Sequence, residues 1–352
     1  MSQIEQNRSS DKEDLEAQIP TKTNTSSKKT LIDIREPVEE HLSIFKSFYK
    51  EALATDVFLL DQIVRYLLRQ NGKKLRPTIV FLTAKLFGDV NKRSYIAATM
   101  VELLHAATLI HDDVVDEADK RRGFLSINRI WKNKASVLLG DFLLSRGLLI
   151  SLENDEFKLL KVLSKAVKSM SEGELRQLKA SKLLNLSEDK YYKIISEKTA
   201  SLIAACCECG AISTSDNTDI HETMHEIGIN MGIAFQIRDD LFDYGVDDVG
   251  KPSYNDIKDR KITLPLIYVL EDASYLEKLK IRRLLKKSKK SKKDISDIVD
   301  FVTERGGIDY AKTKMYHFAE KAKHMINELP KADLADKDNF NELVDFIIER
   351  KR

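Results

Sequence analysis

Cysteine, proline and glycine are all scarce in this chain of 352 residues, which has 3 Cys, 6 Pro and 13 Gly. The cysteines Cys206, Cys207 and Cys209 share one segment, and their odd number and tight spacing fit neither a disulfide framework nor a zinc site. We interpret them as small apolar residues on a buried helix, in a reducing, cytoplasmic compartment. The shortage of proline and glycine, with no run of alternating apolar residues, argues against a β-architecture and favours long helices.

Long apolar runs and an excess of one charge are also missing. No stretch approaches the roughly 20 apolar residues of a membrane span, so we predict no transmembrane segment. The 58 basic and 56 acidic residues leave a net charge of +2, which gives no global argument for nucleic-acid binding. Residues 1–31 are polar and charged and predict a disordered tail without a signal peptide. Asp11, Glu13 and Asp14 argue against a mitochondrial transit peptide.

From residue 32 to residue 352, the pattern predicts a single all-α domain. Apolar residues recur there with helical spacing. The candidate helices are 35–52, 57–70, 75–87, 92–117, 127–131, 134–151, 155–179, 188–212, 217–245, 262–270, 275–287, 293–304, 307–327 and 337–350. Ser187 and Asp216 are candidate N-caps, because a side-chain oxygen at that position can accept a free backbone N–H.

One acidic pentad occurs twice, as DDVVD over 112–116 and as DDLFD over 239–243. On a helix, residues three and four apart share a face, so the first two carboxylates of each pentad point with the last. Carboxylates this close repel one another and need a cation. Oxygen ligands of this kind suit Mg²⁺, which is commonly completed by water and substrate phosphates. The predicted metal ligands are Asp112, Asp113, Asp116, Asp239, Asp240 and Asp243.

A single acidic cluster is usually a solvated helix face, but here both pentads follow apolar runs. Residues 103–110 and 231–237 are apolar nearly all round the helix, which predicts burial. Carboxylates at the end of a buried helix are costly unless a cavity, a metal or another cation meets them. The pair therefore predicts a functional cavity between two similar helices.

Basic clusters next to glycines complement the acidic pentads. Glycine lets the backbone approach an anion while neighbouring side chains neutralise it. These clusters are 72–77 (GKKLRP), 120–123 (KRRG), and Lys251 with Lys258, Arg260 and Lys261. Taken singly, each would be a surface loop; taken with the pentads, they indicate diphosphate chemistry. The further basic run over 278–293 is more typical of a solvated helix–loop–helix than of a site for acidic lipid or nucleic acid.

At these motifs the chain resembles the trans-isoprenyl diphosphate synthase (polyprenyl synthetase) family. The matching segments are 71–77 (NGKKLRP), 102–105 (ELLH), 111–116 (HDDVVD), 121–123 (RRG), 140–141 (GD), 198–199 (KT), 235–243 (FQIRDDLFD), 250–252 (GKP) and 261–265 (KITLP). They follow the family's order and cover about residues 40 to 352. The chain departs from the family pattern at Asn71, Lys74, Tyr254 and Arg260.

The resemblance implies an isoprenoid-synthase-type helical bundle around a deep central cavity. It also implies three Mg²⁺ ions on the acidic pentads, substrates that are isopentenyl diphosphate and an allylic diphosphate, and a homodimer. It implies no nucleic-acid partner, and we add a peripheral membrane contact for product release.

The roles that the resemblance gives to single residues fall into three groups. For the allylic diphosphate they are Arg121, Lys198 and Lys251, with Lys261 helping. For the isopentenyl diphosphate they are Lys73, Arg76, His105 and Arg122. For the allylic cation and its chain they are Thr199, Gln236 and Phe235, with Arg350–Arg352 closing over the site.

Product length is read from the residues before the first pentad. In the family, a large aromatic residue about one turn before it blocks the product tunnel. Here Ala107 and Thr108 take these places, which implies an open tunnel and a long-chain all-trans polyprenyl product. The candidates for the tunnel floor are Leu143, Leu144, Leu148 and Leu149.

Other functions remain open on the sequence alone. A short-chain synthase would make farnesyl or geranylgeranyl diphosphate from the same motifs. A class I terpene cyclase normally lacks the paired Arg121 and Arg122 and a second full pentad, and a non-catalytic subunit of a heteromeric synthase commonly loses the pentads. A metal-binding helical scaffold without catalysis is the remaining alternative.

Overall fold

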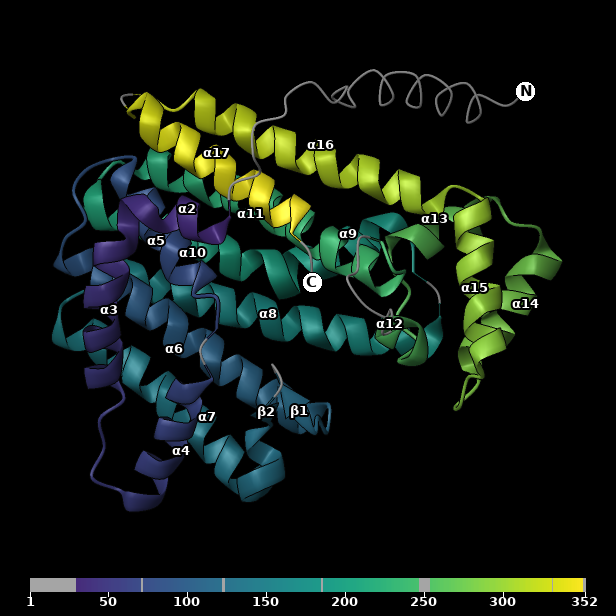
Figure 1. The fold of residues 1–352 in the computed structure, drawn as a ribbon, viewed down its shortest axis with the longest axis horizontal. Coiled ribbons are helices and arrows are strands. Elements are labelled where there is room, and N and C mark those ends of the chain that lie inside the picture. Colours follow the sequence, from purple (N-terminus) through teal and green to yellow (C-terminus); the bar gives the residue numbers. More distant parts are fainter. Residues whose placement is uncertain are drawn as a thin grey trace.

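The computed structural model describes residues 30–70, 72–121, 124–184, 186–246, 254–330 and 332–350. Figure 1 shows a bundle of helices, so the prediction of an all-α fold is confirmed. The predicted tail over 1–31 falls almost entirely outside the described residues. The tail and the single domain over 32–352 therefore stay predictions.

The first half of the chain builds one side of the bundle. Its elements are α2 (Leu31–Arg35), η1 (Glu36–Val38), α3 (Glu39–Ala52), α4 (Phe58–Arg69), α5 (Leu75–Lys85), α6 (Lys92–Val115), β1 (Lys120–Arg121), β2 (Phe124–Leu125), α7 (Ile127–Glu153) and α8 (Phe157–Leu183). The second half adds α9 (Glu188–Ile195), η2 (Ser196–Ala200), α10 (Ser201–Thr214), α11 (Thr218–Asp243), α12 (Asn255–Lys258), α13 (Leu264–Asp272), α14 (Tyr275–Lys286), α15 (Lys292–Glu304), α16 (Gly307–Asn327) and α17 (Leu334–Glu349).

Helix α10 is the centre of the core. It packs against α5, α6, α8 and α11, and nearly all of its residues are buried. Cys206, Cys207 and Cys209 lie on it as free, buried thiols, as the sequence predicted. Burial raises the pKa of Cys206 to about 12, so this thiol stays protonated at neutral pH and acts as a small apolar residue.

Glycines let α11 approach α10 closely. A Cβ on Gly228 would overlap the Cα atom of Ala204, and a Cβ on Gly232 would overlap the Cα atom of Ala200. The two glycines are four residues apart and so lie on one face of α11. This close approach fixes the position of the helix that ends in the second acidic pentad.

Several elements differ from those predicted. The helices 127–131 and 134–151 form one kinked element, α7, in which Lys132 has φ 72° and ψ 165°. The predicted helix 188–212 contains a π-helical turn, η2, between α9 and α10. The basic segment after the first pentad forms a short antiparallel hairpin, β1–β2, that pairs Lys120 with Leu125. The N-cap of α11 is Asn217 and not the predicted Asp216, because the Asn217 side chain accepts the Asp219 N–H.

Helix α7 qualifies the prediction that no apolar segment reaches membrane-spanning length. Among the described residues it is long and apolar enough to cross a bilayer by length and composition, a test that core helices also pass. However, Asp141 and Arg146 fall within its apolar stretch, and such charges are expensive in lipid. Arg146 donates a 2.7 Å hydrogen bond to the Ala52 carbonyl. These contacts favour a helix that packs along α6 in the bundle.

The close approach of α10 and α11 makes a stability prediction. Gly228→Ala should lower the free energy of unfolding by about 1–3 kcal/mol, because the two backbones must separate to admit the methyl group. Gly147→Ala on α7 is the matched control. A Cβ there meets no atom within 4 Å, so helix propensity alone should raise stability by about 0.5–1 kcal/mol. Urea unfolding followed by circular dichroism measures both, and equal stability of the two variants would contradict the packing argument.

Candidate active site

Each acidic pentad ends a long buried helix. Asp112 and Asp113 lie in the last turn of α6, and Asp116 is its C-cap. The second pentad, over 239–243, forms the last residues of α11. The charge of Asp116, in the first pentad, reaches Lys261, in the loop after the second pentad, and helps to raise the pKa of that lysine. The fold thus brings the two pentads to one end.

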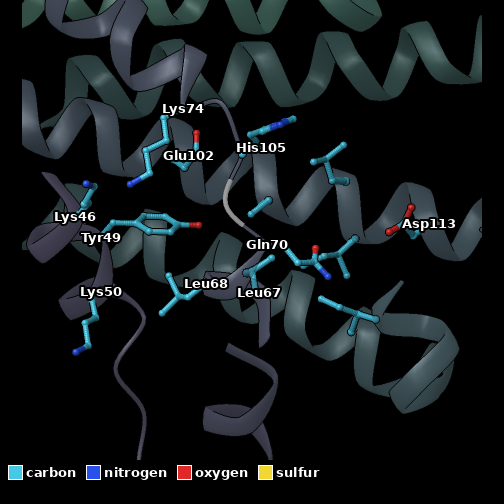
Figure 2. Close-up of a pocket in the computed structure, with 15 residues that line it drawn as sticks. Lys46, Tyr49, Lys50, Leu67, Leu68, Gln70, Lys74, Glu102, His105 and Asp113 are labelled. Atoms are coloured by element: carbon cyan, nitrogen blue, oxygen red, sulfur yellow. The ribbon is translucent and has the colours of Figure 1, made fainter. Parts of the chain in front are cut away.

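The first cavity, which we call the Lys74 cavity, has a volume of about 410 Å³. Figure 2 shows Tyr49 pointing into it from α3, and Lys46 and Lys50 of the same helix at its edge; Glu102 and His105 line it from α6. Its remaining lining residues are Leu67, Leu68, Gln70, Gly72, Lys74, Ala106, Leu109, Ile110, Asp113 and Ile127. This cavity joins a predicted metal ligand to a group of lysines.

The basic residues of this cavity differ partly from those predicted. His105 lines it, but Lys73 is exposed and does not, and the neighbouring Lys74 does. Arg76 is half-buried in the first turn of α5 and is not a lining residue. Burial lowers the pKa of Lys74, as does the charge of Lys46, while Glu102 opposes this effect. A lysine in such surroundings gains from a bound anion.

The second cavity, which we call the Lys198 cavity, is smaller, about 110 Å³. Five predicted site residues line it: Lys198, Thr199, Gln236, Asp240 and Lys261. The structure therefore brings together residues that are up to 63 positions apart in the sequence, from η2, α11 and the loop before α13.

A chain of hydrogen bonds crosses this cavity. Thr199 Oγ1 donates to Gln236 Oε1 at 2.7 Å, and Gln236 Nε2 donates to Asp240 Oδ1 at 2.8 Å. Tyr191 Oη donates to the other Asp240 oxygen at 2.7 Å. Burial raises the pKa of Asp240 well above its usual value, with the charge of Asp256 adding to this, and the two donors oppose the shift. The donors fix the orientation of a carboxylate that burial would otherwise disfavour.

A local departure from α-helix positions Lys198. It lies on the π-helical turn η2, and such turns often mark functional sites. Its ammonium group pairs with Glu174 and donates to Gln177 Oε1 at 2.6 Å. A Cβ on Gly173 of α8 would lie 2.8 Å from the Lys198 backbone nitrogen, so this glycine lets α8 approach the turn.

The carboxylates of the second pentad have three different environments. Asp239 pairs with the Arg350 guanidinium, which also stacks over the Phe235 ring at 3.9 Å. Asp240 holds the hydrogen bonds described above. Asp243 accepts the backbone N–H groups of Asn255 and Asp256, both at 2.8 Å, and so holds the start of α12. Of these three sets of contacts, only that of Asp239 is with a side-chain cation.

The loop after the second pentad places Lys261 between two acidic side chains. Lys261 Nζ lies 3.4 Å from Asp256 and 3.9 Å from Asp259. Burial by itself lowers the pKa of Lys261, but these carboxylates outweigh it and raise the pKa. Three of the departures from the family pattern share one conformation: Lys74, Tyr254 and Arg260 have φ of 44°, 50° and 62°. Left-handed backbone is unfavourable for such bulky residues, so the surrounding contacts must hold it.

Contacts between His111 of α6 and helix α7 explain why Gly140 and Asp141 stand where they do. His111 Nε2 lies 3.3 Å from the Val137 carbonyl oxygen and 3.7 Å from Asp141 Oδ1. A Cβ on Gly140 would overlap the His111 imidazole. Glycine therefore lets α7 approach the last turn of α6 beside the first pentad.

Some predicted residues cannot be placed. Arg122, Lys251, Lys351 and Arg352 lie outside the described residues, as does Asn71. Arg121 is described as a backbone position of β1.

The carboxylates of the pentads offer the oxygen ligands that magnesium prefers. Within the described residues, no three His, Cys, Asp or Glu side chains gather closely enough to hold a metal ion by themselves. The first pentad provides a half-buried Asp112, a buried Asp113 and an exposed Asp116. Mg²⁺ usually takes one or two carboxylates plus substrate phosphates and water, so oxygen donors spread over two helices fit it. The pairing of Asp239 with a guanidinium shows that a positive charge is accommodated there.

An apolar cavity of about 260 Å³ lies deeper, between α6, α7 and α8. Its lining residues are Met100, Leu104, Leu143, Leu144, Gly147, Leu148, Leu160, Leu163, Ser164 and Val167. Met100, Leu104 and Thr108 precede Asp112 at intervals of four residues, so one stripe of α6 leads from the carboxylates back to this cavity.

The predicted chain-length residues lie differently around this cavity. Thr108 is half-buried on the stripe, whereas Ala107 is fully buried in a cluster with Leu103 and Leu139 and lines none of the three cavities. Of the floor candidates, Leu143, Leu144 and Leu148 line the apolar cavity. Leu149 does not, and its side chain is exposed.

Sequence reasoning missed several residues of the site. Tyr191, Gln177 and Glu174 contact predicted residues across helices, and no local spacing announces them. Lys46 and Lys50 of the Lys74 cavity were not predicted either. Their spacing of four residues, on one face of α3, was the available signal.

Comparison with known proteins agrees with this geometry. Residues 57–302 match the family model of polyprenyl synthetase. The chain is 32% identical over 282 residues to the octaprenyl diphosphate synthase of Escherichia coli, which covers 80% of this chain and 87% of that protein. Its fold is similar to the crystal structure of a decaprenyl diphosphate synthase from Rhodobacter capsulatus, with a TM-score of 0.86, 30% identity, and coverage of 92% of this chain and all of that one.

A second solved structure is a polyprenyl synthase from Caulobacter crescentus in complex with calcium and isoprenyl diphosphate. Its TM-score is 0.84 and its identity 31%, with coverage of 93% of this chain and all of that one. The family model and the relatives each extend over more than two thirds of the chain. The chain belongs to the polyprenyl synthetase family.

Proposed function

We propose that this protein is a prenyltransferase that condenses an allylic diphosphate with successive isopentenyl diphosphate units into a long-chain all-trans polyprenyl diphosphate. The observation that carries the proposal is the joint position of the two pentads, two cation-lined cavities and one apolar cavity on the same helices. The octaprenyl and decaprenyl synthases to which the chain is similar support the long product.

In this proposal, different residues of the site bind the metal, bind the diphosphates and stabilise the allylic cation. When bound at the pentads, Mg²⁺ would stabilise the negative charge that develops on departing diphosphate. Lys198 and Lys261 supply fixed positive charge in one cavity, and Lys74 and His105 line the other. Thr199 and Gln236 place side-chain oxygens beside Asp240, where positive charge on an allylic carbon would be favoured. Three ions per site, held by the pentads, and contacts from Arg121, Arg122 and Lys251 remain part of this proposal.

The apolar cavity separates the proposal from its short-chain alternative. The stripe from Asp112 to Met100 covers 12 residues of α6. That corresponds to a depth of about 18 Å at a rise of about 1.5 Å per residue. A short product would not need apolar space at that depth. Both pentads are intact, which argues against the alternative of a non-catalytic subunit.

We propose a homodimer that forms through α7 and α8. Contiguous exposed apolar residues are unusual on a monomer. On α7 they include Val137, Leu138, Leu148, Leu149 and Leu152, and Leu138 is 68% exposed. Leu175 and Leu178 continue the surface on α8. A two-fold contact between identical copies would bury this face, as most homo-oligomers do.

The free thiols support a reducing, cytoplasmic location, because nothing joins the adjacent Cys206 and Cys207. In this proposal, the long-chain product is insoluble in water and is used in membranes. We therefore include a peripheral membrane contact for product release.

The main test removes one carboxylate from each pentad. Asp112→Ala and Asp239→Ala should each lower turnover by about 100- to 1,000-fold or more, since one lost electrostatic contact of this type has that effect. Glu304→Ala, an exposed carboxylate on α15, is the control and should leave turnover unchanged. The assay uses Mg²⁺, farnesyl diphosphate and labelled isopentenyl diphosphate. Full activity in excess chelator, or in both Asp variants, would overturn the proposed function.

A second test fills the apolar cavity. Gly147→Leu should shorten the product, because its side chain enters space that the growing chain needs, while the first condensation continues. Lys161→Phe adds bulk to the exposed side of α8, which also lines the cavity, and should leave product length unchanged. Ala107→Phe examines the chain-length role predicted from the sequence. Product sizing by reversed-phase chromatography measures all three, and a full-length product from Gly147→Leu would remove the cavity from the tunnel.

A third test concerns the dimer. Leu138→Glu combined with Leu149→Glu places charge in the proposed contact and should convert the dimer to a monomer in sedimentation velocity. Leu334→Glu changes an equally exposed leucine outside this face and should leave the dimer intact. A monomeric wild type, or a double variant that still sediments as a dimer, would rule out this interface.

A further inference from the structure

Helix α14, the loop after it and the first two residues of α15 form a strongly basic surface at one end of the molecule. Figure 1 shows both helices at the edge of the bundle, opposite α3 and α4. Seven basic residues there are exposed and form no hydrogen bond or ion pair with any other described residue. We call them the basic end: Lys280, Arg282, Arg283, Lys286, Lys289, Lys292 and Lys293.

The charge of the whole chain is concentrated on this segment. Residues 275–293 contain ten basic residues and one acidic residue, whereas the rest of the chain contains 48 basic and 55 acidic residues. The near-zero net charge of the protein therefore hides a positive end and a negative remainder. A positive surface of this kind attracts an anionic partner at long range.

Exposed apolar side chains lie beside the basic end. Tyr275, Leu276 and Leu279 are 78%, 74% and 44% exposed in the first turns of α14. The basic residues Arg282, Arg283 and Lys286 continue the exposed side of the same helix, and its opposite side is buried through Ile281, Leu284 and Leu285. Interfacial helices combine apolar and basic side chains in this way. A solvated surface needs the charges but not the exposed leucines and tyrosine.

Capping boxes, an ion pair and a hydrogen bond hold the basic end in a defined conformation. Ser274 and Glu277 form a reciprocal capping box at the start of α14, and Arg305 pairs with Glu277. Ser291 and Asp294 form the same motif at the start of α15. Lys287 donates to Asp294 at 2.6 Å and links the two helices. The exposed groups are therefore presented as one preorganised face.

We propose that the basic end, with Tyr275, Leu276 and Leu279, docks the enzyme on an anionic lipid bilayer. The lysines and arginines approach acidic headgroups, and the three apolar side chains enter the interfacial layer. The docking follows from the charge and exposure of this face, and its use in product release rests on the proposed function.

The docking face also adjoins the site. Lys290 Nζ donates to the Lys258 carbonyl oxygen at 3.1 Å, so α14–α15 contacts the helix α12 that carries Asp256. Asp256 and Lys261 line the Lys198 cavity. A bilayer held at the basic end therefore lies next to the loop that borders the diphosphate-binding side.

Vesicle sedimentation tests the proposal without using activity. Wild-type protein should sediment with vesicles of equal parts phosphatidylcholine and phosphatidylglycerol, and not with phosphatidylcholine alone. Each basic residue near an anionic bilayer changes the partition coefficient about fivefold. The variant Arg282→Gln/Arg283→Gln/Lys286→Gln should therefore bind about 100-fold more weakly. The control Lys92→Gln/Lys134→Gln/Lys161→Gln removes the same charge from exposed positions elsewhere and should bind like wild type.

A second variant separates a bilayer from other anionic partners. Tyr275→Ser/Leu276→Ser keeps every charge and should still lower the partition coefficient about tenfold, because apolar surface no longer enters the interface. Equal binding of this variant and wild type, together with tight binding of a single-stranded oligonucleotide, would replace the bilayer with nucleic acid. Equal vesicle binding by the triple variant and its control would overturn the proposal outright.

Turnover in detergent-free solution is measured on the same samples. The basic-end variants should keep wild-type turnover, so loss of docking is distinguishable from failure of the proposed function. A rise in the Michaelis constants at low salt, with unchanged vesicle binding, would mean that the basic end steers diphosphate substrates and does not dock on lipid.

Discussion

Electrostatic repulsion among carboxylates at the ends of two buried helices is the constraint on which the site depends. Each pentad follows a buried, mostly apolar stretch of its helix, so its carboxylates lie at the edge of the core, and of the six only Asp116 is exposed. Every carboxylate there needs water, a donor or a cation. The fold meets this need differently at each position, and these differences define the site.

The second pentad illustrates the division. Asp243 is satisfied by two backbone N–H groups and fixes the loop that follows. Asp240 is satisfied by Tyr191 and Gln236 and anchors the hydrogen-bond chain that includes Thr199. Asp239 is satisfied by a side-chain cation from the far end of the chain. Hydrogen bonds within the protein hold the first two carboxylates, and a side-chain cation holds the third.

Much of the fold and of the site could be predicted from the sequence, because the features that reveal them are local in the chain. The duplicated pentads, their apolar helices and the glycines beside basic residues are all visible over a few turns. The all-α fold follows from the same periodicity, and the buried cysteines follow from their apolar neighbours. Lys198 and Thr199 were found through a family motif, since two residues on a helix carry no chemistry of their own.

The remainder depends on contacts between distant segments or on unusual backbone. Tyr191 reaches Asp240 across 49 positions, and Arg350 reaches Asp239 across 111. The left-handed turn at Lys74 gives that residue, and not the Lys73 of the prediction, a place in the cavity. The π-helical turn at Lys198 inserts one residue's worth of rotation that a 3.6-residue period cannot show. The periodicity of apolar residues predicts which face of a helix is buried. It does not predict which basic side chain, from a distant segment, pairs with the carboxylates on that helix.

The position of Arg350 has a practical consequence for handling the protein. Its carbonyl is held by Arg238 at 2.9 Å while its guanidinium covers Asp239 and Phe235, so the chain after it starts beside the second pentad. A polyhistidine tag attached there would deliver imidazole ligands next to the carboxylates that we propose as metal ligands. Metal titrations on such a fusion would record the tag together with the site.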